Sequence, residues 1–175
     1  RRAGYAAARW PGRLELVTIP GAGPAGSDAE LLLDGAHNPA GAVALAAALD
    51  ELRPLLRGGG GAHPTPLTLV LAIMGDKDVE GVLRALAAAP SLSGARVVAT
   101  QVEGPRALPA AALAAQWSTV AGARSGPVAV IAEPAAAVAR AIAGAEGPVV
   151  VAGSLYLVGA ARALVVDDPD LRDPA

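Results

Sequence analysis

Short runs of β-branched residues or leucine alternate with alanine-rich stretches of helical length along most of the chain, and this alternation limits the possible folds more than any other feature. Each run ends in Gly, Pro, Asp, Asn or Ser, which break regular structure. The pattern predicts strands at 14–19, 31–33, 67–73, 96–100, 128–132 and 149–152. It predicts helices at 39–56, 79–88, 109–120, 134–143 and 155–165. Pro39, Pro109 and Pro134 suit first-turn positions of three of these helices.

The predicted strand at 67–73, Leu-Thr-Leu-Val-Leu-Ala-Ile, is apolar almost throughout. Such a strand suits a sheet whose two faces are both covered by crossover helices. Strand, helix and parallel strand in succession imply a right-handed winding. The sequence therefore predicts one α/β domain with a doubly wound, mostly parallel six-stranded sheet. Its functional loops are expected at the carboxyl ends of the strands.

The composition excludes several kinds of partner. The net charge is -2 and Lys and Arg are not clustered, so the sequence predicts no positively charged patch that would bind nucleic acid or an acidic membrane surface. No uninterrupted apolar run approaches the ~20 residues of a bilayer-spanning helix, and residues 1–10 lack the apolar segment of a secretory signal. The absence of cysteine excludes disulfides, thiol catalysis and thiolate metal sites. We expect a cytoplasmic monomer that binds neither nucleic acid nor membranes.

Two segments rich in glycine and proline fall outside the β-α pattern. Residues 20–28 are predicted to form a flexible turn insertion between the first two strands. Residues 57–66 contain four consecutive glycines, but no Lys-Ser/Thr pair follows them and they open no helix, so a linker is predicted rather than a phosphate-binding loop. His63 is interpreted as a solvated histidine of this loop. Residues 167–175 are predicted to form a loose, charged tail.

A polar turn between a buried strand and a long helix, Asp-Gly-Ala-His-Asn-Pro at 34–39, is the most informative segment. It has an ordinary structural interpretation, in which Asn38 caps the helix and Asp34 ends the strand. The functional interpretation is that Asp34 accepts hydrogen bonds from ribose hydroxyls while His37 faces the same cleft. These residues alone leave both interpretations open.

Two further polar clusters follow predicted strands. In Met-Gly-Asp-Lys-Asp at 74–78, Asp78 suits an N-cap, whereas Lys77 is a compact cation able to hold a substrate carboxylate. In Gly-Ser-Leu-Tyr-Leu at 153–157, Ser154 suits an N-cap. The alternative for Ser154 is anion binding by its hydroxyl together with the N–H groups at the helix start. Structural and functional interpretations are again open for both clusters.

Read in order with Trp-Pro-Gly-Arg-Leu-Glu at 10–15, these three motifs resemble the bifunctional folylpolyglutamate synthase/dihydrofolate synthase family, within the Mur ligase superfamily. The chain departs from the family's pattern in the long insertion between Arg13 and Asp34. The resemblance implies a Rossmann-like carboxyl-terminal ligase domain at 10–166, preceded by an interdomain hinge at 1–9. A phosphate loop and a magnesium site are then expected in an N-terminal ATPase domain, and this chain alone is expected to be inactive.

The resemblance also implies a reaction. Family members transfer the γ-phosphoryl group of ATP to a pterin-linked carboxylate, and the amine of L-glutamate attacks the resulting acyl phosphate. Carried over to this sequence, Arg13 contacts the phosphates and Asp34 binds the ribose. His37 and Lys77 are the candidate catalytic residues, and His37 lies near the acyl phosphate and the amino acid. Lys77 and Ser154 are the candidates for the two glutamate carboxylates. The implied partners are ATP with magnesium, L-glutamate, and folate or dihydropteroate.

Three other functions compete with this one. A dinucleotide-dependent dehydrogenase would show Gly-x-Gly-x-x-Gly after an early strand, where this chain has the turn at 34–39. A peptidoglycan-precursor Mur ligase would keep the chemistry and change the acceptor, but Gly-Ser-Leu-Tyr-Leu disfavours it. A non-catalytic Rossmann-like binding module would have the fold without an ATPase domain. The residues do not distinguish glutamate addition to dihydropteroate from extension of folates.

Overall fold

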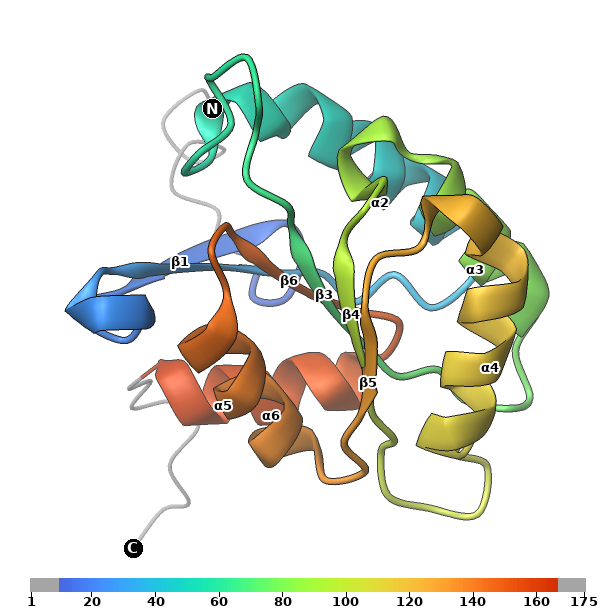
Figure 1. The fold of residues 1–175 in the computed structure, drawn as a ribbon. Coiled ribbons are helices and arrows are strands. Elements are labelled where there is room, and N and C mark those ends of the chain that lie inside the picture. The colour runs from blue at the N-terminus through green and yellow to red at the C-terminus, as the bar shows by residue number, and fades with distance from the viewer. Residues whose placement is uncertain (1–9, 167–175) are drawn as a thin grey trace, which may run out of the picture.

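The computed structural model describes residues 10–166, in which two consecutive strands are followed by alternating helices and strands (Figure 1). The strands are β1 (Glu15–Ile19), β2 (Ala29–Leu33), β3 (Thr68–Leu71), β4 (Arg96–Ala99), β5 (Val128–Val130) and β6 (Val149–Ala152). The helices are α2 (Pro39–Leu52), α3 (Val79–Ala88), α4 (Ala110–Ala121), α5 (Pro134–Gly144) and α6 (Leu155–Val165). None of these helices is long and apolar enough to cross a membrane. The predicted hinge at 1–9 and tail at 167–175 lie outside the described residues.

The strands form one sheet in the order β1-β2-β6-β3-β4-β5, and every neighbouring pair is parallel except β1 and β2. The prediction of a mostly parallel six-stranded sheet is therefore confirmed. β6, the last strand in sequence, lies between β2 and β3. The Gly/Pro-rich residues 20–28 connect the antiparallel β1 and β2 and contain a short 3-10 turn, Pro24–Gly26.

Helices cover both faces of the sheet: α2, α3 and α4 lie on one face, and α5 and α6 lie on the other (Figure 1). Successive side chains of a strand point to opposite faces, so each central strand contributes to two cores. Leu69 and Leu71 of β3 belong to the core under α2, α3 and α4, whereas Val70 belongs to the core under α5 and α6. All three are fully buried, which explains the nearly continuous apolar run. The doubly wound prediction is confirmed.

Proline explains two boundaries that differ from prediction. The predicted helix at 39–56 ends as α2 at Leu52, and Arg53–Leu55 forms a 3-10 turn, because Pro54 has no N–H to continue the helical hydrogen bonds. Pro109 stands at the cap position of α4 and not in its first turn, so that prediction is wrong. The two other prolines assigned to first turns do begin α2 and α5.

The glycine-rich segment at 57–66 precedes β3 and therefore lies away from the carboxyl ends of the strands. Arg53 holds it, because its guanidinium donates hydrogen bonds to the carbonyl oxygens of Arg57, Gly58 and Thr65. Burial lowers the pKa of the Arg53 guanidinium, and the charge of Glu30 opposes this effect. The segment connects α2 to β3, as the linker prediction required.

Candidate functional site

The three polar motifs follow β2, β3 and β6, which are adjacent at the centre of the sheet. Because parallel strands end at the same edge, the motifs converge there. The chain leaves β2 and β3 toward α2 and α3 on one face, and it leaves β6 toward α6 on the other (Figure 1). Opposite departures from neighbouring strands open a crevice, so the end of β6 is where this fold is expected to bind a ligand.

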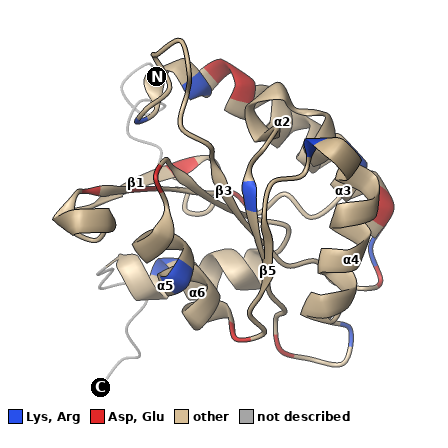
Figure 2. Ribbon diagram, in the orientation of Figure 1, with Lys and Arg blue, Asp and Glu red and all other residues tan. Residues whose placement is uncertain are grey.

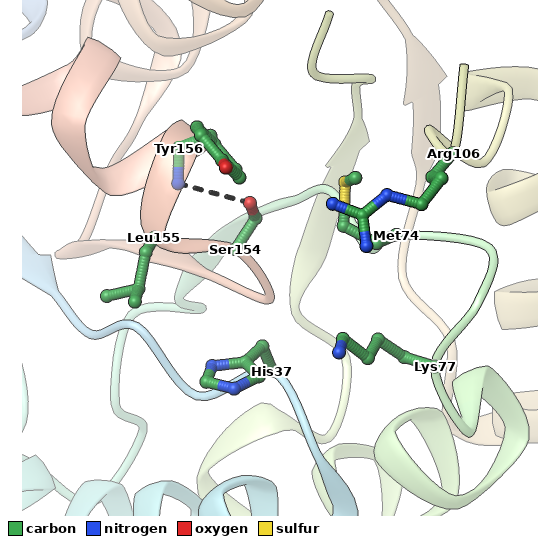
Figure 3. Close-up of a pocket in the computed structure, with 7 residues that line it drawn as sticks. All are labelled: His37, Met74, Lys77, Arg106, Ser154, Leu155 and Tyr156. Carbon is green, nitrogen blue, oxygen red and sulfur yellow. Dashed lines mark hydrogen bonds between the residues drawn. The ribbon is translucent and has the colours of Figure 1, made fainter. Parts of the chain in front are cut away.

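A cavity of about 180 Å³ occupies this crevice and is lined by His37, Met74, Lys77, Arg106, Ser154, Leu155 and Tyr156. It brings together one predicted site residue from each motif, namely His37, Lys77 and Ser154. Figure 3 shows the Lys77 side chain extending toward His37. Arg13 and Asp34 do not line the cavity. In the view of Figure 2, Lys and Arg are spread over several elements. The cavity nevertheless has two of these positively charged residues in its lining, Lys77 and Arg106.

His37 is oriented by its own turn. Its Nδ1 lies 2.8 Å from the carbonyl oxygen of Gly35. A carbonyl can only accept, so we assign a proton to Nδ1, which leaves Nε2 of the neutral ring as an acceptor. The next residue, Asn38, caps α2 by accepting the Gly41 N–H at 2.8 Å, as its structural interpretation predicted. The start of α2 thus fixes His37 at the rim.

Asp34 is buried, with 7% of its surface exposed, and both of its carboxylate oxygens accept backbone N–H groups. Oδ1 accepts from Ala36 at 2.8 Å, and Oδ2 accepts from Leu14 at 2.9 Å. The carboxylate therefore joins the turn after β2 to the segment before β1. Each oxygen has a second lone pair that could accept a ribose hydroxyl. The ribose contact itself stays a prediction.

The Trp-Pro-Gly-Arg-Leu-Glu segment brings Arg13 to the edge of the site. The Gly12 carbonyl accepts the Gly35 N–H at 2.8 Å. The Arg13 guanidinium and the Leu155 side chain both lie against Gly35, where they leave no room for a Cβ atom. Since Leu155 also lines the cavity, Arg13 lies beside the cavity on that side. Leu14 has a φ of 45°, in the left-handed region, so the surroundings must hold this turn in place.

Glu15 holds the same turn from its other end. Its carboxylate accepts the Gly12 N–H at 2.7 Å, and both of its oxygens lie 3.1 Å from Nε of Arg162. The side chains of this ion pair are 21% exposed for Glu15 and 12% for Arg162. The pair is therefore less exposed to solvent screening than an ordinary surface pair.

Glu15→Gln should lower the free energy of unfolding by about 1–2 kcal/mol, because Arg162 loses a partly buried ionic partner. Urea denaturation of the chain measures this difference. Glu80→Gln is the matched control, since Glu80 pairs with Arg84 on the exposed surface of α3 and its loss should cost about 0.5 kcal/mol or less. Equal effects of the two substitutions would contradict a special role for Glu15.

Ser154 and Asp78 cap helices, as their structural interpretations predicted. Ser154 Oγ accepts the Tyr156 N–H at 3.2 Å at the start of α6, and Asp78 accepts the Gly81 N–H at 2.9 Å at the start of α3. Ser154 is only 2% exposed, yet it lines the cavity, and its hydroxyl still has a proton to donate. For Ser154, capping and anion binding are therefore compatible.

Four residues of the lining were not predicted as site residues: Met74, Arg106, Leu155 and Tyr156. Three of them stand inside the predicted motifs, where their side chains carry no charge to single them out. Arg106 lies in the loop after β4, whose carboxyl end faces the same edge of the sheet. A positively charged residue in a loop at the carboxyl end of a strand is the sequence signal that could have identified Arg106.

The described residues do not fit a magnesium site. Residues 10–166 contain no group of three or more His, Cys, Asp or Glu side chains placed to hold a metal ion. The charged groups that line the cavity are Lys77 and Arg106, whereas magnesium prefers oxygen ligands.

Comparison with known proteins identifies relatives of this domain. The family described as dihydrofolate synthetase, C-terminal domain, matches residues 18–164. A dihydrofolate synthase/folylpolyglutamate synthase of Mycobacterium tuberculosis is 41% identical over 116 residues, which are 65% of this chain and 19% of that protein. A folylpolyglutamate synthase of Lacticaseibacillus casei is 32% identical over 163 residues, which are 92% of this chain and 31% of that protein. The crystal structure of Mycobacterium tuberculosis folylpolyglutamate synthase complexed with ADP and AMPPCP has a TM-score of 0.67 and 35% identity, covering 96% of this chain and 35% of that one.

The fold and its basic rim cavity define a Rossmann-like domain with a site suited to anions. The chain belongs to the dihydrofolate synthetase C-terminal domain family, and the predicted family resemblance is confirmed. It spans about a third or less of the length of the curated relatives it matches. These relatives lend no support to the dehydrogenase or peptidoglycan-precursor alternatives.

Proposed function

We propose that this chain is the carboxyl-terminal domain of an ATP-dependent ligase that adds L-glutamate to folates or dihydropteroate through an acyl phosphate. The observation that supports this most strongly is the convergence of His37, Lys77 and Ser154 on one cavity, in a domain of this family. In the intact protein, the domain acts together with an N-terminal ATPase domain, and the protein is a monomer.

The main task of such a site is charge neutralisation. A carboxylate is a poor electrophile, because its charge repels nucleophiles and an oxide leaves badly. Transfer of the γ-phosphoryl group to a carboxylate oxygen releases ADP and supplies a leaving group. The glutamate amine then attacks the acyl carbon, phosphate departs and the nitrogen loses a proton. The reaction brings together the anionic groups of ATP, the acyl phosphate and glutamate. Positively charged side chains at the site therefore stabilise the transition states.

The proposed role of each residue follows from its position. His37, fixed by Gly35, stands near the acyl phosphate and the incoming amine. Lys77 and the Ser154 hydroxyl hold the carboxylates of glutamate. Arg13 contacts the phosphates from beside the cavity, and Asp34 accepts a ribose hydroxyl. Magnesium is assigned to the N-terminal domain, since no residue set described in this chain fits it.

The test compares the intact protein with the 175-residue chain alone. The intact protein should add L-glutamate to dihydropteroate or folate in an ATP-dependent reaction. The chain alone should show no such activity, because it contains no Gly-x-x-x-x-Gly-Lys-Ser/Thr. Glutamate addition by the chain alone, or its absence from the intact protein with every pteroate and folate acceptor, would contradict the proposal.

A further inference from the structure

The loop that carries Arg106 is fastened to the end of β3. The Gly75 N–H donates to the Arg106 carbonyl at 2.7 Å, and the Leu108 N–H donates to the Ile73 carbonyl at 3.2 Å. Met74 and Ala107 form an antiparallel bridge between these two bonds. The backbone of Arg106 is therefore fixed relative to the turn that carries Lys77.

The Arg106 guanidinium is also oriented. Its Nη1 lies 2.9 Å from Asp76 Oδ2, and the two side chains are 61% and 37% exposed. A pair this exposed adds little to stability, so stability alone does not account for its position. A guanidinium has five N–H donors, and one contact to Asp76 leaves most of them able to bind a ligand. Among residues 10–166, no other side-chain partner of this guanidinium is found.

Arg106 changes the charge of the cavity. Arg106 and Lys77 line it together, and no carboxylate does. Two cations in one wall repel each other; Asp76 offsets part of that repulsion, and a bound anion relieves the rest. Figure 3 shows Arg106 across the pocket from His37. An amino acid whose amine is near His37 would therefore extend its side chain toward Arg106.

We propose that Arg106 binds the side-chain carboxylate of the incoming glutamate and that Asp76 is a positioning residue that orients it. The inference rests on the proposed function. A planar guanidinium matches a carboxylate through two parallel hydrogen bonds, which a point charge such as Lys77 cannot make. This assignment replaces the one in which Lys77 and Ser154 hold one glutamate carboxylate each, because both of them now hold the α-carboxylate, next to the reacting amine. Arg106 thereby selects an acidic amino acid over its amide.

The test is steady-state kinetics of the intact protein carrying Arg106→Gln. The KM for L-glutamate should rise about 10- to 30-fold, because the charge-assisted hydrogen bonds to its carboxylate are removed. The KM for ATP should stay within about twofold of the unaltered value. The preference for L-glutamate over L-glutamine should shrink by a similar factor, since the guanidinium distinguishes a carboxylate from an amide. Asp76→Asn should raise the KM for glutamate about threefold and add nothing to Arg106→Gln in the double variant.

Arg84→Gln is the matched control, because Arg84 also forms an exposed pair with an acidic residue but lies on the outer surface of α3. It should leave every kinetic constant unchanged. An Arg106→Gln protein that is active with an unchanged KM for glutamate would overturn this inference alone. An equal rise in the KM for ATP, or a large fall in melting temperature, would also overturn it, since either marks a general disturbance. Failure of the unaltered protein to add glutamate would instead refute the proposed function, and this inference with it.

Discussion

Lys77→Ala in the intact protein should lower kcat/KM for L-glutamate by about 100-fold, while the melting temperature stays the same. The ammonium makes no hydrogen bond or ion pair within residues 10–166, so its removal should leave the fold intact. The expected decrease corresponds to ~2.7 kcal/mol, the size of one charge-assisted hydrogen bond in the transition state. Lys77 is also the only lysine of the chain, and the other 13 of its 14 Lys and Arg residues are arginine.

Lys77→Arg separates charge from shape. A guanidinium keeps the positive charge but is larger, planar and less compact than an ammonium. We expect Lys77→Arg to recover part of the activity that Lys77→Ala loses, with a higher KM for glutamate than the unaltered protein. Steady-state kinetics with glutamate as the varied substrate measures both variants. Full activity of the Lys77→Ala protein would show that Lys77 does not bind glutamate.

Asp34→Ala should lower the free energy of unfolding of this chain by about 2–5 kcal/mol. The substitution leaves the buried N–H of Ala36 and the partly buried N–H of Leu14 without their acceptors, and an unsatisfied buried N–H costs ~1–3 kcal/mol. The strained turn at Leu14 also loses its anchor. Urea denaturation followed by tryptophan fluorescence suits the measurement, because Trp117 is 1% exposed while Trp10 is 73% exposed.

Asp34→Asn is the conservative companion of this variant. An amide keeps one oxygen acceptor and places a donor where the other oxygen stood, so about half of the Asp34→Ala effect is expected. In the intact protein, both variants should also raise the KM for ATP if the ribose contact is made. An Asp34→Ala chain whose stability lies within about 0.5 kcal/mol of the unaltered chain would show that the carboxylate does not hold the turn.

Local sequence signals were sufficient for the elements and their layers. The apolar run of β3 indicated a doubly covered strand, and the prolines marked helix starts at α2 and α5. The place of β6 between β2 and β3 could not be predicted from local signals, because strand order depends on pairings between segments far apart in sequence. That order is nevertheless what brings the three motifs together.

The common location of His37, Lys77 and Ser154 at one cavity was predictable, because each follows a strand of the parallel sheet, whereas their roles stay predictions. The site was not predictable where a residue acts through a distant partner. The carboxylate of Asp34 accepts the N–H of Leu14, which lies 20 positions earlier, and Arg106 pairs with Asp76, which lies 30 positions earlier. Only the folded chain shows that these side chains hold two turns in place.

Peptide-resolved labelling of Lys77 with an amine-selective acylating reagent tests the proposed glutamate site most directly. In that site, His37, Lys77 and Ser154 together bind L-glutamate next to the acyl phosphate. L-Glutamate together with a non-hydrolysable ATP analogue should slow acylation of Lys77 in the intact protein several-fold, whereas L-alanine should not. Unchanged acylation of Lys77 in a protein that adds glutamate would contradict the proposed site.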